Sequence, residues 1–162
     1  MIKEPITKER LKRYIRLRQE IENQLERLER MAASIESPGS MKMDGMPHSN
    51  FAVDRMAIAV SRKIELEDTI KAGLQKEYEE VKELEVGVQL LEEPNERQVI
   101  RLRYFDGLTW MEICEALFGK KKDYTDRIET YERRTYKIHG AALVHIQQAT
   151  TSSPKTSKKE KA

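Results

Sequence analysis

The chain has 162 residues, of which 38% are hydrophobic, 6% are aromatic and 36% are charged. This length allows one or two small domains and leaves no room for a large catalytic scaffold, and the composition favours solvated helices over a thick globular core. A single cysteine cannot build a disulfide framework, and the charged residues 1–10 lack the apolar core of a signal peptide. Because no apolar run approaches the roughly 20 residues that span a bilayer, we expect a cytoplasmic protein.

The net charge of +2 is distributed unevenly along the chain. Counting charged residues gives +2 for residues 1–61, −5 for 62–95, +2 for 96–148 and +3 for 149–162. This pattern is compatible with a C-terminal part that approaches phosphate while an acidic middle segment stays away from it. Charge alone does not distinguish that arrangement from ordinary solvated helix faces.

Residues 7–36 predict a long amphipathic helix. They contain no glycine or proline, and their apolar positions recur at alternating spacings of three and four residues, which is a heptad seam. One arginine interrupts the seam. Its members are Leu11, Tyr14, Arg18, Ile21, Leu25, Leu28, Ala32 and Ile35.

Residues 37–50 contain two prolines and two glycines and predict a loop, after which a second helical pattern runs over residues 51–91. Gly73 and Gly87 are expected to weaken this second helix. Two long amphipathic helices must each bury an apolar stripe, and the simplest solution is an antiparallel, coiled-coil-like hairpin over residues 1–93. Self-association through the same stripe is a competing interpretation, because two helices form only a thin core.

A domain boundary is predicted at Pro94. This proline disfavours helical geometry at Glu93, and Asn95 with Gln98 is placed like an N-cap and its reciprocal partner at the start of a new helix. The new domain is expected to cover residues 94–148. Residues 149–162 are polar, include four lysines and lack apolar periodicity, so we expect a disordered basic tail.

The segment after this boundary predicts two helices joined by a tight turn, the front half of a helix-turn-helix unit. Asp106 and Gly107 supply the turn, Thr109 with Glu112 forms a capping box, and Gly119 is expected to end the second helix in left-handed geometry. The inward-facing residues of the second helix are expected to be Trp110 or Met111, Ile113, Cys114 and Leu117.

The stretch ERQVIRLRYFDGLTWMEICEAL resembles region four of bacterial sigma factors, which combines a basic-apolar helix, a Gly-Leu-Thr or Gly-Leu-Ser turn and an E-I-A-E-x-L pattern. The further run YERRTYKIHGAALVHI is similar to the ending of phage sigma-like late transcription regulators of the RinA and ArpU type. The resemblance covers residues 95–147. It implies an all-α helix-turn-helix domain that binds double-stranded promoter DNA, with contact to host RNA polymerase.

Two features depart from the family pattern. Cys114 stands where sigma factors usually have alanine, and packing of a compact thiol explains it better than redox chemistry. The connection over residues 119–130 is longer than the usual turn of three or four residues before a recognition helix. Either the recognition helix starts near Asp123, or a loop is inserted and the helix starts near Thr130 or Tyr131. We favour the insertion, because the family-like ending then falls in register.

In this register Thr135, Ile138, Ala142 and Leu143 face inward and the other side of the helix is free to meet a major groove. Arginine can bond bidentately to guanine and a glutamate can accept from cytosine, whereas lysines more often contact phosphate. The candidate DNA-binding residues are Thr109, Lys120, Lys121, Lys122, Glu132, Arg133, Arg134, Tyr136 and Lys137.

Neither catalysis nor a cofactor is expected. His48, His139 and His145 share no metal-like spacing with Cys114, so no metal site is predicted. The chain has no phosphate-cradling glycine loop and no nucleophile elbow.

The expected function is sequence-specific transcription regulation, in the form of a phage or prophage late-gene activator. The alternative is a phage packaging factor, like a small terminase subunit, that oligomerises through the hairpin and binds DNA; a purely protein-binding adaptor is a third possibility. The hairpin is expected to act as a homodimerisation or polymerase-docking arm, using its seam and the +5 charge of residues 1–18 toward an acidic partner. The target sequence, the direction of regulation and the oligomeric state stay open.

Overall fold

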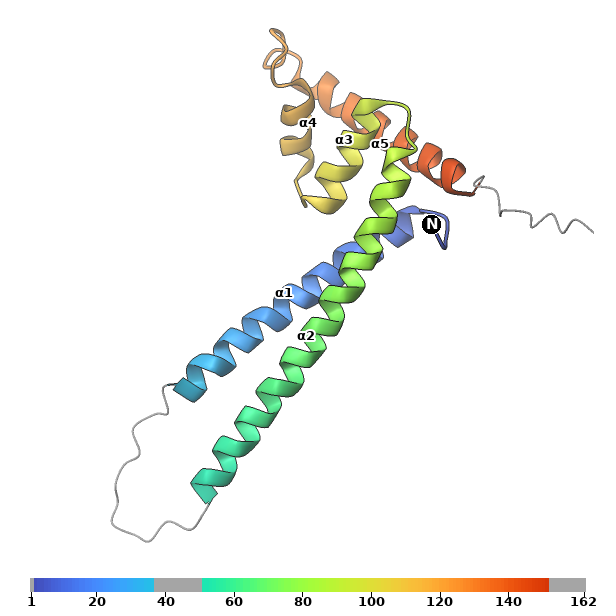
Figure 1. Ribbon diagram of the computed structural model, residues 1–162. Coiled ribbons are helices and arrows are strands. Elements are labelled where there is room, and N and C mark those ends of the chain that lie inside the picture. Colours follow the sequence, from blue (N-terminus) through green and yellow to red (C-terminus); the bar gives the residue numbers. More distant parts are fainter. Residues whose placement is uncertain (1, 37–50, 152–162) are drawn as a thin grey trace, which may run out of the picture. The chain divides into compact units, whose positions relative to one another are not determined.

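The computed structural model describes residues 2–36 and 51–151, with the backbone alone described for residues 51–54. Within these ranges the protein is all-α, as predicted, and contains no strand. The predicted loop at 37–50, with His48, and residues 152–162 of the predicted tail lie outside the described residues. The elements are α1 (Lys8–Glu36), α2 (Phe51–Gln89), α3 (Pro94–Ile100), a π-helical turn η1 (Arg101–Phe105), α4 (Trp110–Phe118) and α5 (Ile128–Thr151) (Figure 1).

Packing divides the chain into two compact units. One is Arg16–Tyr78, and the other joins Met1–Ile15 to Glu79–Ala162. The sequence predicts a domain boundary at Pro94. In the structure the start of α1 and the last turns of α2 pack in the same unit as α3, η1, α4 and α5. The helices that carry the candidate site therefore share a core with the segment before Arg16 and with the last turns of α2.

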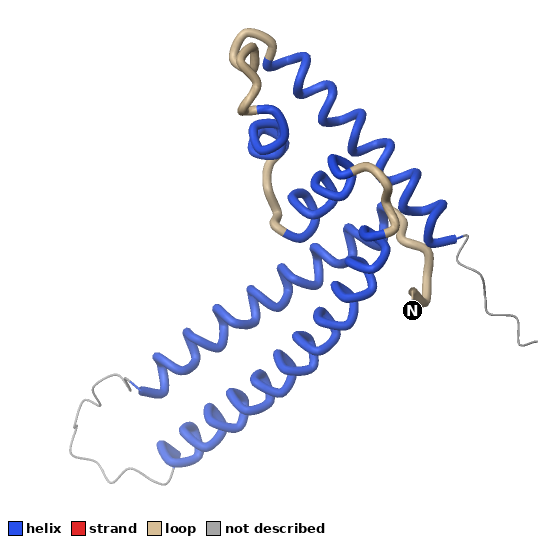
Figure 2. Tube along the Cα trace, turned by 45° about the horizontal axis from the view of Figure 1, so that its top comes forward, coloured by secondary structure: helices blue, strands red, loops and turns tan. Residues whose placement is uncertain are grey.

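In the first unit α1 and α2 run antiparallel, so the predicted hairpin is confirmed (Figure 2). Ile21 is buried, and a Cβ added at Gly73 would lie 3.2 Å from its Cγ1, which shows how closely the two helices approach. Arg18, the residue that interrupts the seam, pairs with Glu77 of α2 at 3.6 Å. Leu25 nevertheless remains 40% exposed. The seam is used within the chain, but it forms a thin core.

The second unit has its core where the N-terminal segment meets the ends of α2 and α5. Ile6 is fully buried, and a Cβ added at Gly87 would lie 2.0 Å from its Cδ1. Gly87 therefore provides the space into which Ile6 packs, which is a specific role and not the general weakening that we expected. The buried core side chains are Ile6, Leu11, Tyr14, Leu84, Val88, Leu91, Ile100, Tyr104, Ala142 and Ile146.

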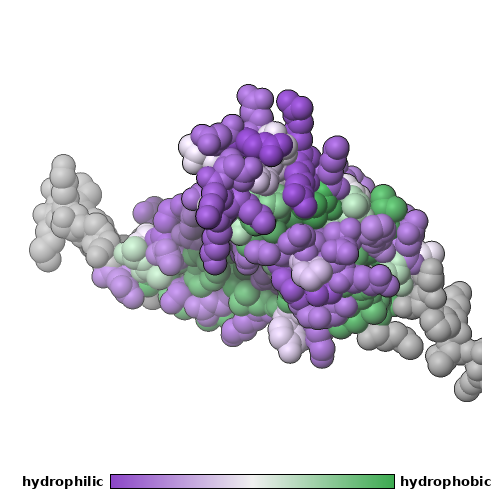
Figure 3. Space-filling view, turned by 90° about the horizontal axis from the view of Figure 1, so that it is seen from above, coloured by the Kyte–Doolittle hydropathy of each residue, from purple (hydrophilic) through white to green (hydrophobic). Residues whose placement is uncertain are grey.

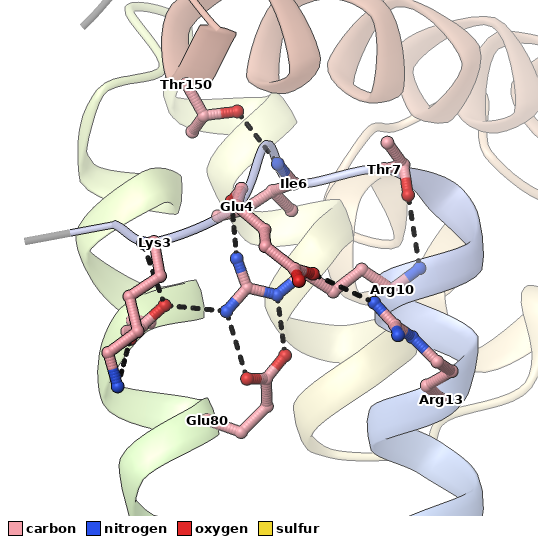
Figure 4. Close-up of polar contacts among 9 residues, drawn as sticks. Lys3, Glu4, Ile6, Thr7, Arg10, Arg13, Glu80 and Thr150 are labelled. Carbon is pink, nitrogen blue, oxygen red and sulfur yellow. Dashed lines mark hydrogen bonds and ion pairs between the residues drawn. The ribbon is translucent and has the colours of Figure 1, made fainter. Parts of the chain in front are cut away.

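The end of α5 is tied to the same segment. The backbone N–H of Ile6 donates to the Thr150 hydroxyl at 2.9 Å, and Thr150 is 7% exposed (Figure 4). The prediction that residues from 149 onward are disordered is wrong for residues 149–151, which are helical. The sequence pattern assigned Thr150 to the tail because its polar side chain interrupts the apolar periodicity. In the structure its hydroxyl accepts a hydrogen bond from the buried N–H of Ile6.

A buried arginine fixes the N-terminal segment against α2. Arg10 is 4% exposed, and it donates from Nε to Glu80 at 2.7 Å, from Nη2 to Glu83 at 2.7 Å and from Nη1 to the Glu4 carbonyl (Figure 4). Burial would raise the pKa of Glu83, but the hydrogen bonds from Arg10 and the Lys3 backbone hold that pKa below its usual value. Part of the basic N-terminus thus finds its acidic partner in the same chain.

Two helix ends differ from the predictions. Glu93 is the extended N-cap of α3, with ψ 123° and no side-chain cap, so the predicted Asn95 and Gln98 cap is wrong. Pro94 at the first helical position explains this, because it has no N–H to cap and its φ is preset for the helix. Gly119 has φ −57° and is right-handed, not left-handed, because the chain continues into further turns. A Cβ there would lie 2.5 Å from the Glu115 carbonyl oxygen.

Gly87→Ala is expected to reduce stability relative to the matched variant Gly140→Ala. Both substitutions place alanine at a helical glycine, which favours the helix by about 1 kcal/mol. The added Cβ has no atom within 4 Å at residue 140, whereas at residue 87 it meets Ile6. Overpacking against buried Ile6 should leave Gly87→Ala less stable than Gly140→Ala by about 1–3 kcal/mol in denaturant unfolding. Equal stability of the two variants would contradict the proposed packing of Ile6.

Arg10→Met is expected to destabilise the protein, whereas Arg13→Met serves as its control. Arg10→Met leaves two partly buried carboxylates without their partner, and removing one partner of a buried ion pair costs about 3–5 kcal/mol. Because Glu80 and Glu83 retain 28% and 15% exposure, we expect about 2 kcal/mol. Arg13 and Glu4 are both more than 60% exposed, so losing their pair should cost less than about 1 kcal/mol. Similar midpoints for both variants would exclude a structural role for the Arg10 contacts.

Candidate nucleic-acid interface

The turn before α4 has the predicted geometry. Gly107 has φ +73°, a left-handed conformation that glycine adopts without strain, and Arg103 donates to the Leu108 carbonyl at 2.9 Å. The Thr109 hydroxyl accepts from the Glu112 N–H, and the Glu112 carboxylate accepts from the Thr109 N–H at 2.7 Å, so the capping box is confirmed. The Thr109 side chain, a candidate DNA contact, is therefore engaged in capping α4.

Aromatic contacts seat α4 against α5. The rings of Trp110 and Tyr136 lie 4.8 Å apart, and those of Phe118 and Tyr131 lie 5.0 Å apart. The start of α4 thus meets a later part of α5, and its end meets the start of α5, so the two helices run in opposite directions. Cys114 is fully buried among these side chains, as the packing interpretation predicted.

The predicted inward face of α4 is largely confirmed. Ile113 is buried and Leu117 is partly buried. Of the two alternatives at the start of the helix, Trp110 turns inward and Met111 is 66% exposed.

A connection of nine residues, 119–127, separates α4 from α5. Helix α5 begins at Ile128, two residues before Thr130, and Asp123 lies within the preceding turns. This agrees with an inserted loop and not with a helix that starts at Asp123. The Tyr131 hydroxyl donates to Asp123 at 2.8 Å, and this hydrogen bond holds the pKa of Asp123 below its usual value. The loop is therefore tied to the first turn of α5.

One side of α5 is buried and the other is free. Thr135 and Ala142 are buried, and Ile138 and Leu143 are partly buried, as predicted. The remaining buried residues of the helix are Tyr131, His139, Ile146 and Thr150. The exposed surface near its start is formed by Glu129, Thr130, Arg133, Arg134, Tyr136, Lys137 and Gly140.

The exposed α5 residues include most of the candidate DNA contacts. Arg133 has 78% of its side chain exposed and makes a 3.7 Å pair with exposed Glu129, a weak interaction. The Arg134 guanidinium lies 5.2 Å from the Phe118 ring, and Lys137 is exposed. Tyr136 is 50% exposed although its ring packs on Trp110. Glu132 is only half-exposed and is the weakest candidate on this helix.

The three lysines at 120–122 are exposed in the turns that follow Phe118. Because Phe118 packs on Tyr131 and Arg134, the end of α4 and the first turns of α5 form one basic area. Residues 119–137 contain seven lysines and arginines against four aspartates and glutamates. Hydrophilic side chains project from the face seen in Figure 3, with apolar surface between them.

Two further arginines belong to this area although the sequence patterns did not single them out as contacts. The Arg103 guanidinium lies 4.7 Å from the centre of the Trp110 ring, beside Tyr136. Arg127 is 61% exposed in the last turn before α5. The only signal for Arg103 was its place in the basic helix before the turn, and Arg127 lay inside a segment without periodicity.

A neutral histidine supports α5 from behind. His139 is 9% exposed, and its Nε2 lies 3.0 Å from the Tyr104 hydroxyl. Burial, together with the charges of Lys8 and Arg103, lowers the pKa of His139 to about 4. Burial also raises the pKa of Tyr104. At neutral pH the tyrosine hydroxyl can therefore donate to an uncharged imidazole, which anchors the middle of α5 to η1.

The free energy of unfolding should fall as pH drops from about 6.5 to about 4, in part because of His139. The folded-state pKa lies below the unfolded value, so the stabilising contribution is complete above pH 6.5 and is lost as protonation becomes favourable in the unfolded chain. The shift of the pKa from 6.5 to about 4 corresponds to about 3 kcal/mol. Denaturant unfolding followed by Trp110 fluorescence should show a shallower pH dependence for His139→Gln than for the wild type. Identical pH dependence would contradict a neutral, buried His139.

The described residues show neither a metal-ligand cluster nor a membrane-spanning helix. Across residues 2–36 and 51–151, no three His, Cys, Asp or Glu side chains group as metal ligands do. In the same ranges no helix is long and apolar enough to cross a membrane. No protein-family model, curated protein or solved structure matches this chain.

Proposed function

We propose that the exposed side of α5, together with the turns at 119–127, binds double-stranded DNA, and that the protein is a sequence-specific transcription regulator. The observation that carries this proposal is the placement of Arg133, Arg134 and Lys137 on the exposed face of a helix whose opposite face packs against the core. An α-helix fits the major groove, where arginine side chains can read guanine. Because the backbone of this packed helix is already ordered, DNA binding has to order only the side chains.

The two basic elements differ in what they can contact. Arg133 and Lys137 stand one helical turn apart on the free side of α5. The sequence alone favoured a phosphate contact for Lys137, but its place one turn from Arg133 also suits it to a base edge. Lys120, Lys121 and Lys122 are flexible point charges in exposed turns and are suited to phosphates. Trp110, held between Arg103 and Tyr136, stiffens the surface beside the base-reading residues.

The resemblance of residues 95–147 to region four of sigma factors and to phage late regulators supports a role at promoters with host RNA polymerase. The nine-residue connection before α5 departs from the compact turn of an ordinary helix-turn-helix. The proposal therefore rests on the basic face of α5 and not on the motif alone.

The first test is a selection of binding sites from random duplexes at a stated salt concentration, followed by comparison of variants. Arg133→Ala with Lys137→Ala should lose most discrimination between the selected and a scrambled duplex, since each good base contact contributes about 1–3 kcal/mol. Arg27→Ala with Arg30→Ala is the control, because it removes two exposed arginines of α1 in the other unit. Unchanged helicity by circular dichroism is required of both. Unchanged discrimination in the α5 variant would show that the base-reading surface lies elsewhere.

Replacing Lys120, Lys121 and Lys122 by alanine should weaken binding to all duplexes alike. Each lost phosphate contact should reduce the slope of log affinity against log salt by about 1. Loss restricted to the selected sequence would instead assign base reading to the turns.

A further inference from the structure

A second apolar stripe runs along α2, away from the face that packs on α1. Val60, Ile64, Leu74 and Tyr78 are 39%, 52%, 44% and 62% exposed. With 3.6 residues per turn they share one side of the helix, about a quarter turn from Ile70, which is buried. The seam between α1 and α2 leaves this stripe uncovered.

The stripe has the spacing of a coiled-coil seam with two charges at its centre. Positions 60, 64, 67, 71, 74 and 78 alternate spacings of four and three residues. The two central positions are Glu67, whose side chain is 37% exposed, and Lys71, whose side chain is 75% exposed. Their ion pairs along α2, to Lys63 at 3.7 Å and to Asp68 at 3.8 Å, are weak surface contacts that can be exchanged.

The sequence of the stripe is symmetric about Thr69. Antiparallel pairing around this residue places Val60 opposite Tyr78, Ile64 opposite Leu74 and Glu67 opposite Lys71. Each facing pair, or layer, then joins a heptad d position (60, 67 or 74) of one helix to an a position (64, 71 or 78) of the other. In both charged layers Glu67 of one copy faces Lys71 of the other. Parallel in-register pairing would instead bring Glu67 onto Glu67 and Lys71 onto Lys71, which is unfavourable.

We propose that this stripe binds the same stripe of a second copy of the chain, antiparallel, with the two-fold axis at the level of residue 69, between Glu67 and Lys71. The contact is isologous, as in most homodimers, and extends about 27 Å between the outer layers at 1.5 Å per residue. Polar residues within a coiled-coil seam fix register and partner orientation at some cost in stability, and here Glu67 and Lys71 have that role. A four-helix assembly would also shield a hairpin whose own core is thin. The interaction is independent of DNA binding.

Charge variants test the pairing. The wild type should be a dimer by analytical ultracentrifugation, whereas Glu67→Lys and Lys71→Glu, each alone, should be monomeric because like charges then meet in both central layers. An equimolar mixture of the two variants should recover dimers, since each layer again joins opposite charges. Circular dichroism controls for loss of the helix. A wild type that is monomeric at high micromolar concentration, or single variants that remain dimeric, would overturn the proposal.

Cysteine variants test the orientation. Oxidation of an equimolar mixture of Ile64→Cys and Leu74→Cys should give cross-linked dimers, whereas either variant alone should remain largely uncross-linked. The wild type is the control, because its Cys114 is fully buried. Efficient cross-linking of Ile64→Cys with itself would show parallel pairing and contradict the symmetric arrangement.

Discussion

The core of the second unit is built around Ile6, which is fully buried and packs where residue 87 has no side chain. The backbone N–H of Ile6 donates to Thr150 at the end of α5. Arg10 holds the same segment through three charge-assisted hydrogen bonds to Glu80 and Glu83. The short segment before α1 thereby links the last turns of α2 to the last turn of α5 in a single core.

This anchoring explains how α5 can offer a free surface. Its later turns contribute Ala142 and Ile146 to the core, its middle is held by the contact between His139 and Tyr104, and its first turn packs on Phe118. These contacts all lie on one side of the helix. Arg133 and Lys137 are exposed and lie outside these contacts, so they are free to meet a ligand.

Local patterns in the sequence predicted elements well and long-range contacts poorly. The heptad spacing predicted α1, and the pair of Thr109 and Glu112 predicted the start of α4, because both signals involve neighbours within one or two turns. The burial of Arg10 and Thr150 could not be predicted, because their partners are distant in the sequence. Glu80 is 70 positions from Arg10, and Ile6 is 144 positions from Thr150. The sequence favours a start of α5 near Thr130 or Tyr131 but also allows one near Asp123, because residues 119–127 carry charge and turn residues but no periodicity. At the candidate site the outward and inward faces of α5 followed from spacing, whereas the place of Arg103 over Trp110 needed the fold.

Hydrogen exchange can show whether the turns at 119–127 and the exposed side of α5 form the proposed DNA-binding surface. Amide exchange followed by mass spectrometry on the full chain, with and without sheared duplex DNA at low salt, requires no knowledge of the target sequence, because phosphate contacts supply non-specific binding. The account predicts slower exchange in peptides that cover residues 119–137, with no change in residues 16–36. Protection confined to α1 and α2, or no protection anywhere at DNA concentrations that saturate binding of a basic control protein, would contradict it.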